Sequence, residues 1–273
     1  MNQSGPLTIR SRDNALLVRL RRLAREPAAY RRLGEVWLEG EHLCDALRQR
    51  GGQALRCVVS ESAWQQEPLR QLAQWAAQVV IVTDALFEGI SSLESSGKLG
   101  FVLASPQAAN VVPGVNSVVL DRLQDAGNVG SILRTAAAFG VTQVIALQGT
   151  AALWSPKVLR AAMGAHFGLH LVEAARLDDL RALQVPWIGT SLSTSQLLHE
   201  TVLPAPCAWL LGHEGQGLDA TLLAACAQVI RIPQPGGEES LNVAAAAAVC
   251  LYESMRQRLR AAAPVTAIPS PTQ

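Results

Sequence analysis

Three short stretches of the chain combine polar side chains with glycine or other small residues, each where an apolar strand is expected to pass into a helix. Residues 128–134 (NVGSILR) follow the apolar run 117–120, and residues 212–218 (GHEGQGL) follow the apolar run 208–211. Residues 229–251 begin as a short strand, break at prolines and glycines, and continue into an alanine-rich helix. Because the first turns of such a helix carry only small side chains, a ligand or another segment can pack almost onto the backbone. A plain structural turn is the competing interpretation.

The order and spacing of these stretches are N-x-G-x-x-x-R, then G-x-E-G-x-G-L, then I-P followed after six residues by S-L-N. They resemble the three motifs of the SpoU/TrmH-type RNA ribose 2′-O-methyltransferases, in the SPOUT superfamily. A single glycine-rich turn is a weak signal, but three motifs in this order are specific, and the resemblance covers residues 7–259. It implies an S-adenosylmethionine-dependent enzyme that methylates a ribose 2′-hydroxyl in rRNA or tRNA. It also implies a homodimer that uses neither a metal nor a membrane.

The resemblance assigns roles to the motif residues. Arg134 takes the place of the family's central catalytic arginine, and the polar positions around it are matched by Asn128, Glu214, Ser240 and Asn242. The positions that bind the methyl donor are matched by Gly212, Ile232 and Leu241, and Leu211, Thr190 and Gly217 are expected to contribute further contacts. His213 stands where the family usually has a small or amide residue.

Ribose methylation places particular demands on these side chains. A hydroxyl attacks a methyl group that is already activated, so the reaction needs alignment and help with the hydroxyl proton. Because a guanidinium stays protonated in proteins, we expect Arg134 to bind the phosphate beside the target ribose and to stabilise developing negative charge. An exposed helix arginine is the alternative. Glu214 is expected to anchor either Arg134 or a helix N-terminus, and Ser240 is expected to be an N-cap.

Positive charge gathers near the N-terminus. Residues 10–32 hold eight arginines against Asp13 and Glu26, a local balance of 8 − 2 = +6 in a chain of net charge +1. This segment predicts a bound polyanion, and the expected RNA-binding residues are Arg10, Arg19 and Arg22, with Lys157 and Arg160 in a later segment that the family brings to RNA. A solvated helix face and an arginine-rich transit peptide are the alternatives. The leucines among these arginines favour a folded amphipathic helix that Pro27 ends.

Composition narrows the class of protein. The 273 residues, 49% hydrophobic and 16% charged, suffice for one large or two modest domains. Apolar runs are too short to span a bilayer, and no secretory signal is evident. The five cysteines are scattered among apolar neighbours, which favours reduced thiols in the cytoplasm and no zinc site.

The alternation of strand and helix patterns predicts an α/β protein in two parts. Residues 1–105 are expected to form a mixed sheet covered by helices, 106–116 a linker, 117–260 an open parallel sheet, and 261–273 a disordered tail. In the first part we expect strands at 35–38, 55–59, 79–82 and 100–103, and helices at 41–50, 67–77 and 84–90. In the second we expect strands at 117–120, 143–147, 169–173, 187–189, 208–211 and 229–232, and helices at 129–139, 156–163, 178–183, 219–226 and 241–260. The resemblance adds a ribosomal-protein-like RNA-binding domain and a C-terminal trefoil knot, which periodicity does not predict.

Two other functions fit the sequence less well. A non-catalytic RNA-binding or ribosome-assembly protein with the same fold has no reason to keep both Arg134 and Asn242. A Rossmann-type enzyme needs G-x-G-x-x-G after the first strand of its unit, whereas the glycines at 212, 215 and 217 have the reversed spacing and lie near the end of the chain.

Overall fold

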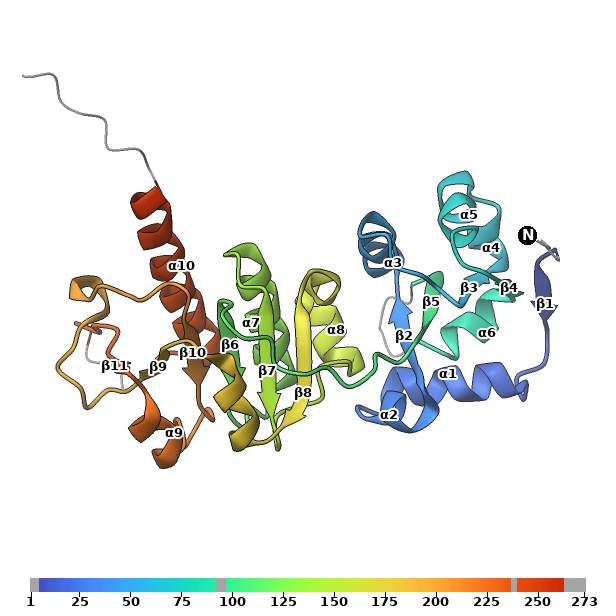
Figure 1. Ribbon diagram of the computed structural model, residues 1–273. Coiled ribbons are helices and arrows are strands. Elements are labelled where there is room, and N and C mark those ends of the chain that lie inside the picture. The colour runs from blue at the N-terminus through green and yellow to red at the C-terminus, as the bar shows by residue number, and fades with distance from the viewer. Residues whose placement is uncertain (1–4, 92–96, 237–239, 263–273) are drawn as a thin grey trace, which may run out of the picture.

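The computed structural model describes residues 5–91, 97–236 and 240–262 (Figure 1). They form two β-sheets that lie next to each other along the molecule, each with its own helices. The predicted mixed sheet and parallel sheet are both present. Residues 237–239 of the third motif and nearly all of the expected C-terminal tail lie outside the described residues.

The N-terminal sheet has five strands in the order β1-β4-β3-β5-β2 and mixes parallel with antiparallel pairs. Its strands are β1 (Leu7–Ile9), β2 (Glu35–Glu39), β3 (Arg56–Ser60), β4 (Val79–Val82) and β5 (Leu99–Ala104). Its helices are α1 (Ala15–Arg25), α2 (Ala29–Leu33), α3 (Glu41–Gln49), α4 (Glu61–Trp64), α5 (Glu67–Ala73) and α6 (Asp84–Glu88). The sequence prediction missed β1, α2 and α4, which are too short to show a periodicity, and it extended α5 by four residues.

Helix α1 forms where the arginine-rich segment was expected to be helical. Asn14 is its N-cap, with a side chain that accepts a hydrogen bond from the Leu16 N–H at 2.9 Å. Leu17, Leu20 and Leu23 are buried against the sheet, which leaves the arginines on the outer side. The helix ends before Pro27, as predicted.

The C-terminal sheet is entirely parallel, in the order β11-β9-β10-β6-β7-β8. Its strands are β6 (Ser117–Leu120), β7 (Gln143–Leu147), β8 (His170–Ala175), β9 (Trp187–Thr190), β10 (Ala208–Leu211) and β11 (Gln228–Ile230). The chain builds β6, β7 and β8 outward, places β9 two positions beyond β6, and then inserts β10 between β9 and β6. The open parallel sheet is therefore confirmed, but its strand order departs from a simple progression.

Both faces of this sheet are covered. On one face, α7 (Ala126–Ala138), α8 (Pro156–Ala162) and α10 (Val243–Ala262) pack on Val118, Leu120 and Trp209. On the other face, α9 (Ala220–Ala225) and a 3-10 helix (Leu177–Leu183) pack on Val119, Ala208 and Leu210. Successive residues of one strand therefore point to opposite faces of the sheet and pack in different hydrophobic cores. Two further 3-10 helices span Ala165–Gly168 and Leu198–Glu200. The segment 178–183 was expected to be an α-helix, and it forms 3-10 turns instead.

The two sheets are joined by specific contacts. Tyr30 in α2 donates its hydroxyl to both carboxylate oxygens of Glu173 in β8, at 2.7 and 2.8 Å, and Arg31 bonds the same carboxylate at 3.2 Å. Leu159 of α8 packs into the N-terminal core although its neighbour Val158 packs into the C-terminal one. The N-terminal unit is therefore docked on the β8 edge of the parallel sheet.

Candidate functional site

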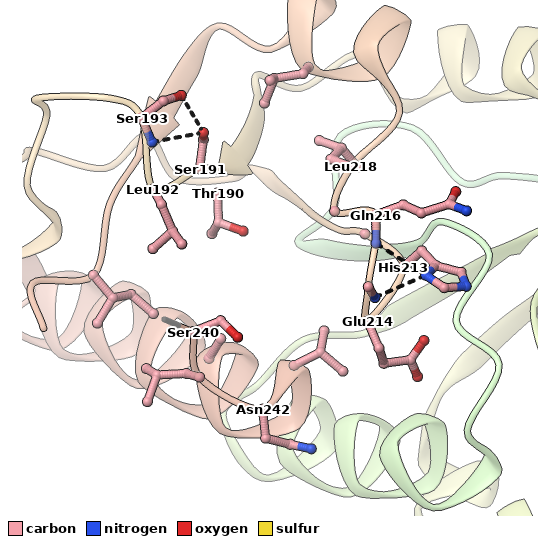
Figure 2. A pocket seen from close by; sticks show the side chains of 18 of the residues that line it. Thr190, Ser191, Leu192, Ser193, His213, Glu214, Gln216, Leu218, Ser240 and Asn242 are labelled. Atoms are coloured by element: carbon pink, nitrogen blue, oxygen red, sulfur yellow. Dashed lines mark hydrogen bonds between the residues drawn. The ribbon is translucent and has the colours of Figure 1, made fainter. Parts of the chain in front are cut away.

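A cavity of about 620 Å³ lies at the carboxyl ends of β9, β10 and β11, where ligands commonly bind in open α/β sheets. Three loops enclose it: residues 190–193 after β9, the turn 212–218 after β10, and residues 232–243, of which 237–239 are not described, between β11 and α10. Figure 2 shows Thr190, Leu192 and Leu218 around this space, with Ser240 near the start of α10. Segments far apart in the chain thus converge on one cavity.

Five of the six predicted donor-binding residues line this cavity: Thr190, Gly212, Gly217, Ile232 and Leu241. The sixth, Leu211, is only 2% exposed and packs in the core at the end of β10. The sequence prediction missed the loop residues 191–193 and Gln234, which also line the cavity. A serine-rich loop carries no motif, so only its position after β9 would have identified it.

Gly212 marks a close approach between two segments of backbone. A Cβ atom at this position would lie 2.1 Å from the Leu218 nitrogen and 2.2 Å from the Gly217 carbonyl carbon. The turn closes through a hydrogen bond from the Gly217 N–H to the His213 carbonyl at 2.8 Å, with Gly217 at φ +70°. Only glycine at 212 lets the turn fold back onto the strand end and leave the cavity open.

A chain of amides and one carboxylate links the three motifs at the edge of the cavity. The Asn242 side-chain amide donates to the Asn128 side-chain oxygen at 3.0 Å. The Asn128 amide donates in turn to Glu214 at 3.3 Å. The Asn242 oxygen also accepts hydrogen bonds from the Ala244 and Ala245 N–H groups, at 2.9 and 3.3 Å. This relay, Asn242–Asn128–Glu214, therefore joins the starts of α10 and α7 to the turn after β10.

Glu214 anchors the N-terminus of α7, one of the two roles expected of it. Its two oxygens accept from the Gln124 and Asp125 N–H groups, at 3.3 and 3.2 Å. Partial burial acts against ionisation, but hydrogen bonds from the N–H groups of Glu214 itself and Asp125, and from the Asn128 amide, outweigh it and lower the pKa of Glu214. The Asn128 N–H and the Lys157 ammonium, which lies 3.1 Å away, lower the pKa of Asp125. Both carboxylates are therefore ionised acceptors at neutral pH.

Arg134 lies away from this relay. It is exposed on α7, on the face that also carries Ser131 and Ala138, as the helix pattern predicted for Ser131 and Arg134. Within the described part of the chain, no hydrogen bond or ion pair connects it to Glu214 or the two asparagines, and it does not line the cavity. The expectation that the polar motif residues surround Arg134 is not met within one chain.

The start of α10 differs from the prediction. We expected a helix from Leu241 with Ser240 as its N-cap, but the helix begins at Val243 and Asn242 provides the capping side chain. Both residue types are good N-caps, and the longer amide also reaches Asn128. Ser240 is exposed at the cavity.

The predicted RNA-binding residues fall in two places. Arg10, Arg19 and Arg22 belong to the N-terminal unit, which Figure 1 shows at the opposite end of the molecule from β9 and β11. Arg19 is paired with Glu35 and Arg22 with Glu26, both at 3.1 Å, whereas Arg10 is 78% exposed with a longer contact to Glu61 at 3.6 Å. The other two, Lys157 and Arg160, are on α8.

Among the described residues, no group of three or more His, Cys, Asp or Glu side chains is placed to hold a metal ion. No helix in the described ranges combines the length and apolar character needed to cross a membrane.

Known proteins resemble this chain over most of its length. The model of the SpoU rRNA Methylase family matches residues 116–252. An uncharacterized tRNA/rRNA methyltransferase of Synechocystis is 34% identical, over 94% of this chain and 96% of its own length. The 23S rRNA (guanosine(2553)-2'-O)-methyltransferase RlmP of Bacillus subtilis is 30% identical, over 79% of this chain and 86% of its own.

Solved structures agree with this assignment. The crystal structure of an RNA 2'-O ribose methyltransferase is 29% identical and superimposes with a TM-score of 0.76, covering 93% of this chain and all of that one. The AdoMet-bound rRNA methyltransferase from Sinorhizobium meliloti is 25% identical with a TM-score of 0.79, covering 91% and 97%. On the matched motifs, the shared fold and this similarity, the chain belongs to the SpoU rRNA methylase family.

Proposed function

We propose that this protein transfers a methyl group from S-adenosylmethionine to a ribose 2′-hydroxyl in rRNA or tRNA. The observation that carries the proposal is that the second and third motifs line one cavity, and that the Asn242–Asn128–Glu214 relay joins the first motif to both of them. The relatives named above methylate RNA, and one of them is named for a guanosine of 23S rRNA.

The cavity fits the methyl donor. Gly212 places no side chain at the end of β10, and Thr190, Ile232 and Leu241 supply a mixed polar and apolar lining. Its volume of about 620 Å³ is within the range that holds small molecules. Bound S-adenosylmethionine supplies a methyl group on a positively charged sulfur, so the protein's task is to align the attacking hydroxyl and accommodate its proton.

The relay prepares the site for that task. It fixes the N-termini of α7 and α10 next to each other at the edge of the cavity, and each helix start carries partial positive charge from its aligned backbone dipoles. Negative charge that develops on the attacking oxygen is stabilised by such fixed dipoles without further rearrangement. Because the lowered pKa of Glu214 makes it a weak base, its role is to hold the relay in place.

Arg134 acts across a homodimer in this account. It lies outside the cavity of its own chain, so a second copy must bring it to the hydroxyl and the neighbouring phosphate. An apolar stripe on α10 offers the contact surface: Ala245, Val249 and Tyr252 are spaced four and three residues apart and are all exposed. Val249→Asp should shift the protein from dimer to monomer in sedimentation and abolish methyl transfer.

The remaining features belong to the same proposal. The chain is divided into an RNA-binding domain of ribosomal-protein-like fold over residues 1–105, a linker over 106–116, and a methyltransferase domain over 117–260. The insertion of β10 between β9 and β6 supports a C-terminal trefoil knot, and the arginines on the outer side of α1 support the RNA-binding role. The enzyme acts in the cytoplasm, where its RNA substrates are made.

The test of this function is Arg134→Ala, with Arg181→Ala as a control. Arg181 is also exposed, and among the described residues its one ion pair is with Asp178, at 3.2 Å. Arg134→Ala should abolish transfer of label from S-adenosylmethionine to RNA while leaving the donor's dissociation constant unchanged, and Arg181→Ala should do neither. Loss of donor binding together with transfer would contradict the role given to Arg134.

Mixing two inactive variants tests whether the arginine acts across the dimer. Arg134→Ala keeps its cavity, and Gly212→Val keeps its arginine but has no room for the donor. If each site combines the cavity of one copy with the arginine of the other, a mixed dimer has one active site of two. An equal random mixture, half of which is mixed dimer, should then recover about a quarter of the wild-type rate. No recovery in a mixture shown to contain mixed dimers would place Arg134 and the cavity of one chain in the same site.

A further inference from the structure

His213 is held in a single orientation at the edge of the cavity. Its Nδ1 atom accepts hydrogen bonds from the Gly215 and Gln216 N–H groups, at 3.0 and 3.3 Å. Two donors that point at Nδ1 leave no room for a proton there, so the neutral ring carries its proton on Nε2. Nε2 makes no hydrogen bond with any described residue, and the side chain is half-buried. His213 therefore presents one fixed N–H donor and is not placed to act as a base.

Gln216, in the same turn, presents a second fixed donor. Its side-chain oxygen accepts from the Arg122 guanidinium at 3.4 Å. Arginine only donates, so the atom of Gln216 that faces it must be the carbonyl oxygen and the amide nitrogen must face away. Figure 2 shows the His213 and Gln216 side chains projecting to the same side of the turn, away from Thr190 and Leu192 across the cavity.

Arg122 is itself held in place by hydrogen bonds to a buried carboxylate. It has φ +57°, which is uncommon for a residue with a side chain. Its guanidinium bonds both oxygens of Asp121, at 2.8 and 3.0 Å, and Asp121 is 3% exposed. Asp121 also accepts from the Asp219 N–H at 2.9 Å. The two hydrogen bonds to Asp121 hold the guanidinium where it orients Gln216.

The charge around these donors argues against a phosphate as their ligand. Arg122 and Lys157 contribute two positive charges, and four carboxylates (Asp121, Asp125, Glu214 and Asp219) contribute four negative ones, a balance of 2 − 4 = −2. Both positive groups are already paired with carboxylates. Two neutral donors in a negative surrounding suit uncharged acceptor atoms, such as those on a nucleobase.

We propose that His213 and Gln216 recognise the base of the target nucleotide, and that this base is guanine. Guanine offers two neighbouring acceptors, O6 and N7, on one edge, whereas adenine places a donor beside its N7 and each pyrimidine offers a single acceptor or a donor on the corresponding edge. Bases in single-stranded RNA expose this edge to protein side chains. The inference rests on the proposed methyl transfer and adds the choice of nucleotide. His213 is a positioning residue in this role.

The experiment begins with the wild-type protein and total RNA from cells that lack it. Digestion to nucleosides after methyl transfer identifies the ribose-methylated base and its position. A synthetic RNA spanning that position is then made with guanine, with 7-deazaguanine, which lacks the N7 acceptor, and with 2-aminopurine, which lacks O6. We measure kcat/KM for each RNA and the dissociation constant of S-adenosylmethionine by calorimetry.

His213→Asn is the informative variant, because an asparagine oxygen still accepts from the Gly215 N–H and keeps the turn, while the longer reach of Nε2 is lost. His199→Asn is the matched control, since His199 is exposed, does not line the cavity, and is paired with Glu200 at 3.5 Å. On the guanine RNA, His213→Asn should lower kcat/KM about tenfold, with donor affinity within about twofold of wild type. One of the two altered bases should lower kcat/KM of the wild type about tenfold. The same base should lower kcat/KM of His213→Asn much less, because the side chain that binds the missing acceptor is already absent from the variant.

Three results would overturn the inference. Methylation at a nucleotide other than guanosine would remove its basis, and so would His213→Asn with wild-type kcat/KM. If His213→Asn lowers the affinity for S-adenosylmethionine as much as it lowers kcat/KM, His213 is a residue that binds S-adenosylmethionine. If the wild type methylates no RNA although it binds S-adenosylmethionine, the proposed function itself fails, and the inference fails with it.

Discussion

Gly212→Ala is a test of how the cavity is built. The added Cβ would lie 2.1 Å from the Leu218 nitrogen, whereas an ordinary contact needs at least 3.4 Å. The turn after β10 must therefore move away from the strand end by about 1.3 Å, the difference between these two distances. The atoms that have to move are main-chain atoms of a closed turn, so no flexible side chain can absorb the change.

The energetic consequence follows from that displacement. Crowding a well-packed site by one carbon typically costs about 1–3 kcal/mol. For a chain of this size the melting temperature should fall by about 2–12 °C. The displaced turn also lines the donor cavity, so we expect S-adenosylmethionine to bind at least about tenfold more weakly.

The assay compares Gly212→Ala with Gly215→Ala, the same chemical change three residues along the same turn. A Cβ at 215 would meet nothing closer than the His213 ring at 3.9 Å. Gly215→Ala should therefore keep its stability within about 0.5 kcal/mol of wild type. Thermal unfolding and calorimetric titration with S-adenosylmethionine measure both quantities. Wild-type stability and donor affinity in Gly212→Ala would refute the close approach on which the cavity depends.

Three further predictions concern other parts of the molecule. Tyr30→Phe should lower the free energy of unfolding in urea by about 1–2 kcal/mol, because the half-buried Glu173 carboxylate loses a donor; unchanged stability would remove this contact from the interface between the two sheets. Burial lowers the pKa of His166 to about 4, so the unfolded chain binds a proton first as pH falls. The free energy of unfolding should then be highest above about pH 6.5 and decline by up to about 3 kcal/mol towards pH 4. In urea titrations at several pH values, His166→Phe should not show that part of the decline. Reversing the charges of Arg10, Arg19 and Arg22 should weaken RNA binding and reduce its salt dependence, and an unchanged salt slope in filter binding would exclude α1 from the RNA interface.

Much of the fold could be predicted where local signals agree. The bounds of β6, β7 and β10 match the expected strands, because each is a short apolar run between polar or glycine-rich segments. In α7, Val129, Ile132, Leu133 and Ala136 recur at helical spacing, and all four are buried. Ser155 caps α8 and Pro156 occupies its first turn, positions that these residue types favour.

Other features depend on contacts that the sequence does not display. The strand order of the parallel sheet follows from tertiary packing, as does the pairing of the three-residue β1 with β4. Asn242 rather than Ser240 caps α10 because Asn128 also binds its amide, a partner 114 residues away. The lining role of residues 191–193 is set by their neighbours across the cavity.

The position of Arg134 shows the same limit at the candidate site. The apolar periodicity of the helix places Arg134 off the buried face, and the structure leaves it exposed. Neither this periodicity nor the motif shows that Glu214 accepts from the Gln124 and Asp125 N–H groups, because these contacts join residues 90 and 89 positions apart in the chain. Nor do they show that Arg134 lies outside the lining of the cavity, which is set by tertiary packing.

The central claim is methyl transfer to a ribose hydroxyl of RNA. The direct measurement incubates the protein with labelled S-adenosylmethionine and with separated rRNA and tRNA from cells that lack it, then digests each fraction to nucleosides. The account predicts label in a 2′-O-methylated nucleoside from one fraction, and none with Arg134→Ala. Label in a base-methylated nucleoside, or no label in either fraction and in assembling ribosomal particles despite donor binding, would contradict it.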